Sequence, residues 1–114
     1  MGNYQDLEVW TLAVDLAELV YVKTHLLPKS ETFGLISQMR RASVSIATNI
    51  AEGYGRNTRG EYLQFLGIAN GSRLELETLI NVSERVYVEI DMGPLRAASA
   101  RIGMMLTKLK LALK

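Results

Sequence analysis

The sequence predicts an all-α protein, an antiparallel up-down-up-down four-helix bundle that assembles into an oligomer. Apolar residues recur at helical spacing through four segments, and turn and capping residues stand between those segments. No segment shows the alternation typical of a strand. A chain of 114 residues, 48% hydrophobic and 22% charged, suits one domain with a single core. We expect helices at about residues 6–26, 31–54, 59–88 and 92–113.

The first segment is apolar almost all round. Its polar strip is narrow, and leucines lie on several sides of the expected helix. A helix of this kind is buried on two sides, and in so short a chain a second subunit is the simplest cover for the second side. Pro28 ends the segment, because proline cannot continue a helix.

The second segment combines a small core face with a polar strip. Ser30 is its expected N-cap, and Glu31 places a negative charge in the first turn. Ala42 and Gly53 keep the core face small, so another backbone can approach closely. The polar strip predicts ties to the third helix, and we expect at least one of Arg40 and Arg41 to pair with Glu52 or Glu75. The expected structural polar cluster consists of Gln38, Arg41, Ser45, Asn49, Glu52, Ser72 and Glu75.

The third segment begins with the spacing of a capping box, formed by Thr58 and Glu61. It contains no proline and should continue to about residue 88, which is long for a globular helix. Gly67 and Gly71 lie inside it, and a helix tolerates such glycines where a neighbour packs close.

The fourth segment follows Asp91, its expected N-cap, and accepts Pro94 in its first turn. Besides a core stripe it carries a second apolar line, which runs between basic residues. This line and the apolar excess of the first segment together predict contact with another subunit. The expected oligomer interface consists of Leu12, Leu16, Leu19, Ala97, Met104 and Leu111.

The formal net charge of +1 hides a segregation of charge along the chain. Residues 92–114 carry five basic side chains and no acidic one, whereas residues 74–91 carry five acidic side chains and one basic. Such segregation can give a nearly neutral protein a basic surface. Cations near a helix C-terminus also complement its dipole, but Arg96 and Arg101 lie too early in their helix for that explanation.

Several function classes have no support in the sequence. The chain has no cysteine, its N-terminal residues do not resemble a signal peptide, and no run is long enough for a membrane span, so we expect a cytoplasmic protein. The single histidine, His25, has no partner at a fixed spacing. A metal or small-ligand enzyme would need a pocket among Gln38, Asn49, Glu52 and Glu75. The sequence supplies no histidine ligand for such a pocket. We therefore expect no catalytic residue, cofactor or metal.

The chain resembles the small four-helix-bundle proteins of the 23S rRNA intervening-sequence family. The resemblance rests on residues 38–46, 49–53 and 75–77 and on the opening Leu-Glu-Val-Trp at residues 7–10, and it covers nearly the whole chain. One departure is Asn70, since a basic residue often stands there in the family.

This resemblance implies a bacterial homo-oligomer, with a pentamer expected. Family members are often encoded in segments that interrupt ribosomal RNA genes. A related bundle, the accessory variability protein of diversity-generating retroelements, binds nucleic acid and works with a reverse transcriptase. The resemblance supports a non-enzymatic protein that binds RNA or DNA. The basic side chains expected to make this contact are Arg96, Arg101, Lys108, Lys110, Arg56 and Arg59.

The alternative hypothesis is a protein-interaction scaffold that docks a partner, such as a polymerase or reverse transcriptase, through its apolar helix surfaces. The near-zero net charge favours this alternative. The scarcity of aromatic residues for base stacking does so too, because we expect Trp10, Phe33 and Phe65 to be buried.

Overall fold

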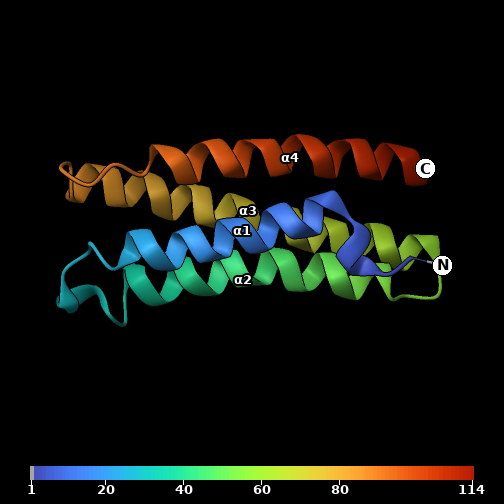
Figure 1. Cartoon of the computed structure of the whole chain (residues 1–114), viewed down its shortest axis with the longest axis horizontal. Helices are drawn as coiled ribbons and strands as arrows, with labels where there is room; N and C mark the ends of the chain where they lie inside the picture. The colour runs from blue at the N-terminus through green and yellow to red at the C-terminus, as the bar shows by residue number, and fades with distance from the viewer. Residues whose placement is uncertain (1) are drawn as a thin grey trace.

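The computed structural model describes residues 2–114 as four antiparallel helices in an elongated bundle of 44 × 21 × 20 Å (Figure 1). No strand occurs in that part of the chain, so the predicted all-α bundle is confirmed. Two short 3-10 helices, η1 and η2, precede the first and second long helices. The bounds are η1 Tyr4–Asp6, α1 Glu8–Thr24, η2 Lys29–Glu31, α2 Leu35–Tyr54, α3 Arg59–Val86 and α4 Gly93–Leu113. Among these described helices, none is both long enough and apolar enough to cross a membrane.

The helices pack in chain order around one core. Each helix contacts the next, α1 also contacts α4, and the packing is most extensive between α2 and α3. Both termini lie at one end of the bundle together with the α2–α3 turn, residues 55–58 (Figure 1). We call this the terminal end. The opposite end, with the α1–α2 and α3–α4 connections, is the distal end.

The core is aliphatic and fully enclosed. Burial of one such side chain contributes roughly 1.5–3 kcal/mol, so these residues supply most of the driving force for folding. Core side chains with less than 2% exposure include Leu16, Val20, Met39, Ile46, Ile50, Leu66, Leu76, Ile80, Met92, Leu95, Ile102 and Leu106.

The small face of α2 allows the close approach to α3 that the sequence predicts. Ala42 and Gly53 are buried. A Cβ atom placed on Gly53 would lie 2.8 Å from Phe65 Cβ and 3.3 Å from the carbonyl oxygen of Tyr62. Glycine is therefore required where the end of α2 crosses the start of α3.

The start of α2 differs from the prediction. Ser30 is not its N-cap, because Ser30 and Glu31 belong to η2 and three residues separate Glu31 from the start of the helix at Leu35, whose N-cap is Gly34. The Glu31 carboxylate still serves the helix, since its Oε1 accepts a hydrogen bond from the Leu35 amide at 3.2 Å. Tyr87 at the end of α3 donates its hydroxyl hydrogen to Glu31 Oε2 at 2.5 Å. This bond lowers the pKa of Glu31 and raises the pKa of Tyr87.

The other two predicted caps lie close to their expected positions. Thr58 caps α3, because its hydroxyl accepts a hydrogen bond from the Glu61 amide at 3.1 Å. At α4 the N-cap is Met92 rather than Asp91. Asp91 Oδ1 nevertheless accepts a hydrogen bond from the Gly93 amide at 2.8 Å, and Pro94 occupies the first turn as expected.

Candidate nucleic-acid interface

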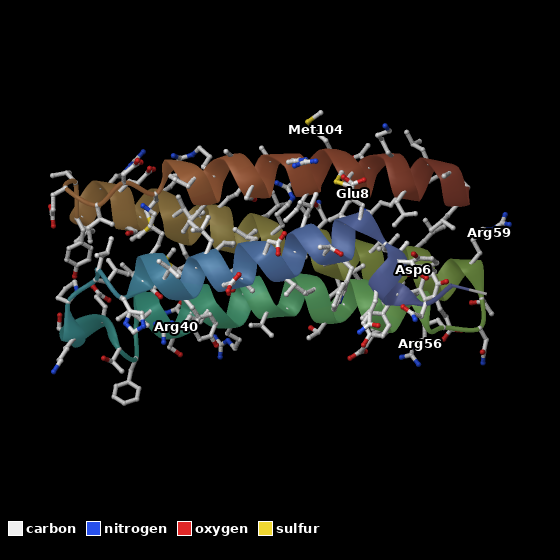
Figure 2. The ribbon with its side chains drawn as sticks, in the orientation of Figure 1. Asp6, Glu8, Arg40, Arg56, Arg59 and Met104 are labelled. Atoms are coloured by element: carbon white, nitrogen blue, oxygen red, sulfur yellow. The ribbon has the colours of Figure 1, made fainter. Side chains whose placement is uncertain are left out.

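Four of the six predicted contact residues gather at the terminal end. Arg56 lies in the α2–α3 turn and Arg59 begins α3, and Figure 2 shows both at that end of the bundle. Lys108 and Lys110 lie near the end of α4, which finishes at the same end (Figure 1). Within residues 2–114 none of these four side chains makes an ion pair. They form the terminal basic cluster.

Arg56 is held in place by an aromatic ring. Its guanidinium carbon lies 4.6 Å from the centre of the Phe65 ring, a cation–π contact. The contact uses the face of the guanidinium and leaves its N–H groups available. Arg56 therefore presents its donors in a restricted orientation, which suits bidentate contact with a phosphate.

The other two predicted residues are bound to acidic groups. Arg96 donates two hydrogen bonds to the Glu84 carboxylate and one to Asn81 Oδ1 at 2.7 Å. The hydrogen bond from Arg96 lowers the pKa of Glu84, and the same bond raises the pKa of Arg96. Arg101 Nη2 lies 3.3 Å from Glu8 Oε1, and both side chains are well exposed. Such an exposed pair is weak, whereas Arg96 would have to exchange a bidentate partner for a phosphate.

The structure brings together three of the seven predicted polar-cluster residues. Ser45 and Ser72 share a hydrogen bond of 2.8 Å that joins α2 to α3. Asn49 Nδ2 donates to the carbonyl and hydroxyl oxygens of Ser45 at 2.8 and 3.0 Å, so its bonds stay within α2. The remaining members are exposed and make no side-chain hydrogen bond in the described chain; they are Gln38, Arg41, Glu52 and Glu75.

The expected ion pair between an arginine of α2 and Glu52 or Glu75 is wrong. No such pair exists among residues 2–114. Arg40 instead donates from Nε to the hydroxyl oxygen of Thr24 at 3.0 Å, which anchors α2 to the end of α1.

A different polar network joins α3 to α4, and the sequence patterns did not reveal it. Arg73 donates to Glu77 Oε2 at 2.7 Å and to Asn70 Oδ1 at 2.9 Å. The Ser99 hydroxyl of α4 donates to the same Glu77 oxygen at 3.0 Å. Gly103 makes room for the guanidinium, because a Cβ there would lie 2.6 Å from Arg73 Cζ. The spacing of four residues between Arg73 and Glu77 is the only local signal for this network.

The predicted oligomer interface needs one correction. Leu16 is 1% exposed and belongs to the core of the single chain, so it cannot contact another subunit. Leu12 and Leu19 are half-buried and line a shallow groove of about 130 Å³ between α1 and α4. Met104 and Leu111 are 70% and 64% exposed, and Figure 2 shows Met104 directed away from the bundle. Ala97 is also exposed on α4.

A second exposed apolar surface lies on α3. Gly67 and Gly71 stand among its residues, and within the described chain a Cβ on either glycine would meet nothing within 4 Å. The neighbour that would make these glycines useful is therefore absent from the single chain. The exposed apolar side chains of this α3 face are Ile68, Leu74, Val82 and Val86.

The burial of the aromatic side chains differs from the prediction. Trp10 and Phe65 are half-buried, the former in edge contact with Tyr4 at a ring separation of 5.1 Å. Phe33 is 94% exposed in the connection before α2, so its expected burial is wrong. Helical periodicity could not have placed Phe33, because it lies outside any long helix.

The described residues contain no group of three or more histidine, cysteine, aspartate or glutamate side chains close enough to hold a metal ion. His25 is exposed just after α1.

The sequence matches a known protein family over most of its length. The family model described as 23S rRNA-intervening sequence protein matches residues 5–108 of the 114. No curated protein matches the chain.

Proposed function

Because the chain belongs to the 23S rRNA-intervening sequence protein family, we propose that it is a non-enzymatic, homo-oligomeric bundle protein that binds RNA or DNA. The observation that carries this proposal is the terminal basic cluster, Arg56, Arg59, Lys108 and Lys110, whose members make no ion pair within the described chain. An unpaired surface cation can contact a phosphate without first giving up a protein partner.

Assembly strengthens the electrostatic argument. A single chain carries a net charge of +1, which is too little for strong attraction by itself. A symmetric oligomer repeats the terminal basic cluster once in each subunit, so modest charge per chain becomes a concentrated field. A pentamer is the assembly we propose.

The test of nucleic-acid binding compares two double variants of equal charge. Arg56→Gln with Arg59→Gln removes two cations from the terminal end, and Lys29→Gln with Arg85→Gln removes two exposed cations from the distal end. Fluorescence anisotropy with labelled ribosomal RNA, single-stranded DNA and duplex DNA is measured over a salt series. We expect the unaltered protein to bind with affinity that falls as salt rises. On duplex DNA the terminal variant should show a shallower salt slope, by about 0.9 for each phosphate that it no longer neutralises.

The distal variant serves as the control and should keep the slope of the unaltered protein. Equal weakening in both variants would indicate attraction by net charge alone and would contradict the assignment to the terminal end. A protein that fails to bind even at low salt would contradict nucleic-acid binding altogether.

The oligomer is tested by multi-angle light scattering at micromolar concentration. We expect a mass about five times the 12.7 kDa of one chain. Met104→Glu should lower this mass, because it places a charge at the centre of the exposed apolar line on α4. Val88→Glu is the matched control, since Val88 is 78% exposed in the α3–α4 connection, outside that line. A monomeric mass for the unaltered protein would end the oligomer proposal.

A protein-interaction scaffold is the second candidate, and the apolar face of α3 favours it. Ile68, Leu74, Val82 and Val86 are each more than 40% exposed. Apolar surface of this kind, when contiguous, marks contact with another protein. A partner docked on α3 would leave the terminal basic cluster accessible, so both functions are compatible in one molecule.

A further inference from the structure

An open groove of about 520 Å³ lies over the seam between α1 and α2, apart from the terminal basic cluster. Figure 2 shows Arg40, one of its lining residues, well away from Arg56 and Arg59 along the bundle. The lining includes two arginines and no carboxylate, so the groove carries positive charge without an acidic neighbour among its walls. The lining residues are Tyr21, Ser37, Arg40, Arg41, Val44, Ser45 and Thr48.

Arg40 is fixed in this groove by contacts with α1. Its Nε donates to the buried Thr24 hydroxyl at 3.0 Å, and its Nη2 lies 3.4 Å from the carbonyl oxygen of Tyr21. Its guanidinium carbon stands 4.4 Å from the centre of the Tyr21 ring. These contacts engage one side of the guanidinium and leave both N–H groups of Nη1 available. A ligand that binds these groups restricts the side chain little further, which favours binding.

Arg41, unlike Arg40, is not held by a hydrogen bond to any other side chain of the described residues. It is exposed, and in residues 2–114 it makes neither an ion pair nor a side-chain hydrogen bond. Ser37 stands one turn earlier on α2, between the two arginines in helical angle, and lines the same groove. A guanidinium bonded to α1, an unpaired guanidinium and a hydroxyl thus line one groove, and this donor set matches a phosphate group.

The shape of the groove favours a phosphate that belongs to a polymer. Sites for small ligands enclose most of the ligand surface, whereas this groove is open to solvent on one side. A phosphodiester chain, held by several separate contacts, needs no enclosure. Tyr21 is 44% exposed and Val44 is 40% exposed, so a base or sugar next to the phosphate would meet an aromatic and apolar surface.

We propose that this α1–α2 groove binds a single-stranded segment of nucleic acid, with a phosphate at Arg40 and Arg41 and the neighbouring base against the part of the Tyr21 side chain that Arg40 leaves exposed. The inference rests on the proposed function and adds a second contact site to it. Single strands are specified because an unpaired base can leave its stack and reach an aromatic side chain.

Two substitutions test the groove without replacing Arg40, whose hydrogen bond to Thr24 joins α2 to α1. Arg41→Gln removes the unpaired cation, and Tyr21→Leu removes the aromatic ring but keeps an apolar side chain. Arg85→Gln is the matched control, because Arg85 is an exposed arginine on α3 that does not line the groove. Affinity is measured by fluorescence anisotropy with a labelled single-stranded oligonucleotide and with a duplex, and circular dichroism checks that each variant is folded.

We expect Arg41→Gln to weaken single-strand binding about three- to tenfold and to reduce the salt slope by about 0.7, the change that follows when one phosphate is no longer neutralised. Tyr21→Leu should weaken single-strand binding about tenfold, as removal of one base–aromatic stack does, and should leave duplex binding unchanged. Arg85→Gln should bind both probes as the unaltered protein does.

The outcomes separate this inference from the proposed function. If the unaltered protein binds, and Arg41→Gln and Tyr21→Leu both bind the oligonucleotide with the affinity of Arg85→Gln, the groove assignment is overturned. The terminal basic cluster then remains as the binding surface. Absence of binding by the unaltered protein overturns both proposals. Inorganic phosphate is added at constant ionic strength as a further arm. If inorganic phosphate binds through Arg41 while Arg41→Gln and Tyr21→Leu leave the affinity for the oligonucleotide unchanged, the ligand is a free anion and the single-strand assignment fails.

Discussion

Replacing Gly53 with alanine should lower the free energy of unfolding by about 1–3 kcal/mol, the usual cost of adding atoms to a well-packed contact. The added Cβ would lie 2.8 Å from Phe65 Cβ and 3.3 Å from the Tyr62 carbonyl oxygen. Neither atom can move by rotating a side chain, because one is fixed to the backbone and the other belongs to it. The gain in helix propensity offsets only part of this cost. Thermal and urea unfolding followed by circular dichroism measures the change.

Gly67→Ala is the matched control. From the structure of the single chain, we expect it to raise the free energy of unfolding instead of lowering it. A Cβ at Gly67 meets nothing within 4 Å in the described chain, so alanine should add about 0.5–1 kcal/mol by helix propensity. A Gly53→Ala protein as stable as the unaltered one would contradict the close approach of α2 and α3. Destabilisation by Gly67→Ala that grows with protein concentration would instead place a second chain against α3.

Replacing Glu77 with alanine should lower the free energy of unfolding by about 1–3 kcal/mol, because it leaves a partly buried charge without its partner. Arg73 has a side-chain exposure of only 13%, and its guanidinium would stay between α3 and α4. Breaking a fully buried pair costs more, but the 32% exposure of the Glu77 side chain reduces the effect. The Ser99 hydroxyl would lose its acceptor at the same time. Chemical denaturation measures the change in stability.

Glu75→Ala provides the control for this prediction. Glu75 lies two residues earlier on the same helix, is exposed and makes no side-chain hydrogen bond in the described chain, so its removal should change stability by no more than about 0.5 kcal/mol. Combining Glu77→Ala with Arg73→Met should restore part of the stability, since the unpaired charge is removed. If Glu77→Ala and Glu75→Ala behave alike, the network does not hold α4.

The number, order and approximate bounds of the helices follow from local sequence signals. Thr58 shows why this works, because a cap and the residue it bonds are only three positions apart. The start of α2 shows the limit of such signals. Glu31 is held by Tyr87, which lies 56 residues later, and no local pattern contains that contact.

The first helix shows a second limit. Periodicity assigns residues to lines along a helix, but a helix that is apolar almost all round does not reveal which line faces the core. The structure buries the line through Val9, Ala13, Leu16 and Val20. Leu16 therefore belongs to the core, although its residue type suits an interface equally well.

The residue types of the candidate nucleic-acid interface could be predicted from the sequence. Which of its cations are bound to acidic side chains could not be predicted. From the sequence, Arg56 and Arg96 alike are predicted as cations that contact nucleic acid. Only the fold places Arg96 against Glu84, across the α3–α4 connection, and leaves Arg56 on an aromatic ring. The availability of a cation for phosphate is thus a tertiary property.

The order in which the helices pack has a consequence for the kinetics of folding. Apart from the contact between α1 and α4, every contacting pair of long helices in this bundle is adjacent in the chain. Adjacent helices meet by closing short loops, which costs little chain entropy and favours rapid folding. The α2–α3 pair, which has the most extensive packing, is therefore the pair expected to form first, and α1 and α4 then add to it from either side of the sequence. The contact between α1 and α4, the most distant along the chain, closes the bundle last.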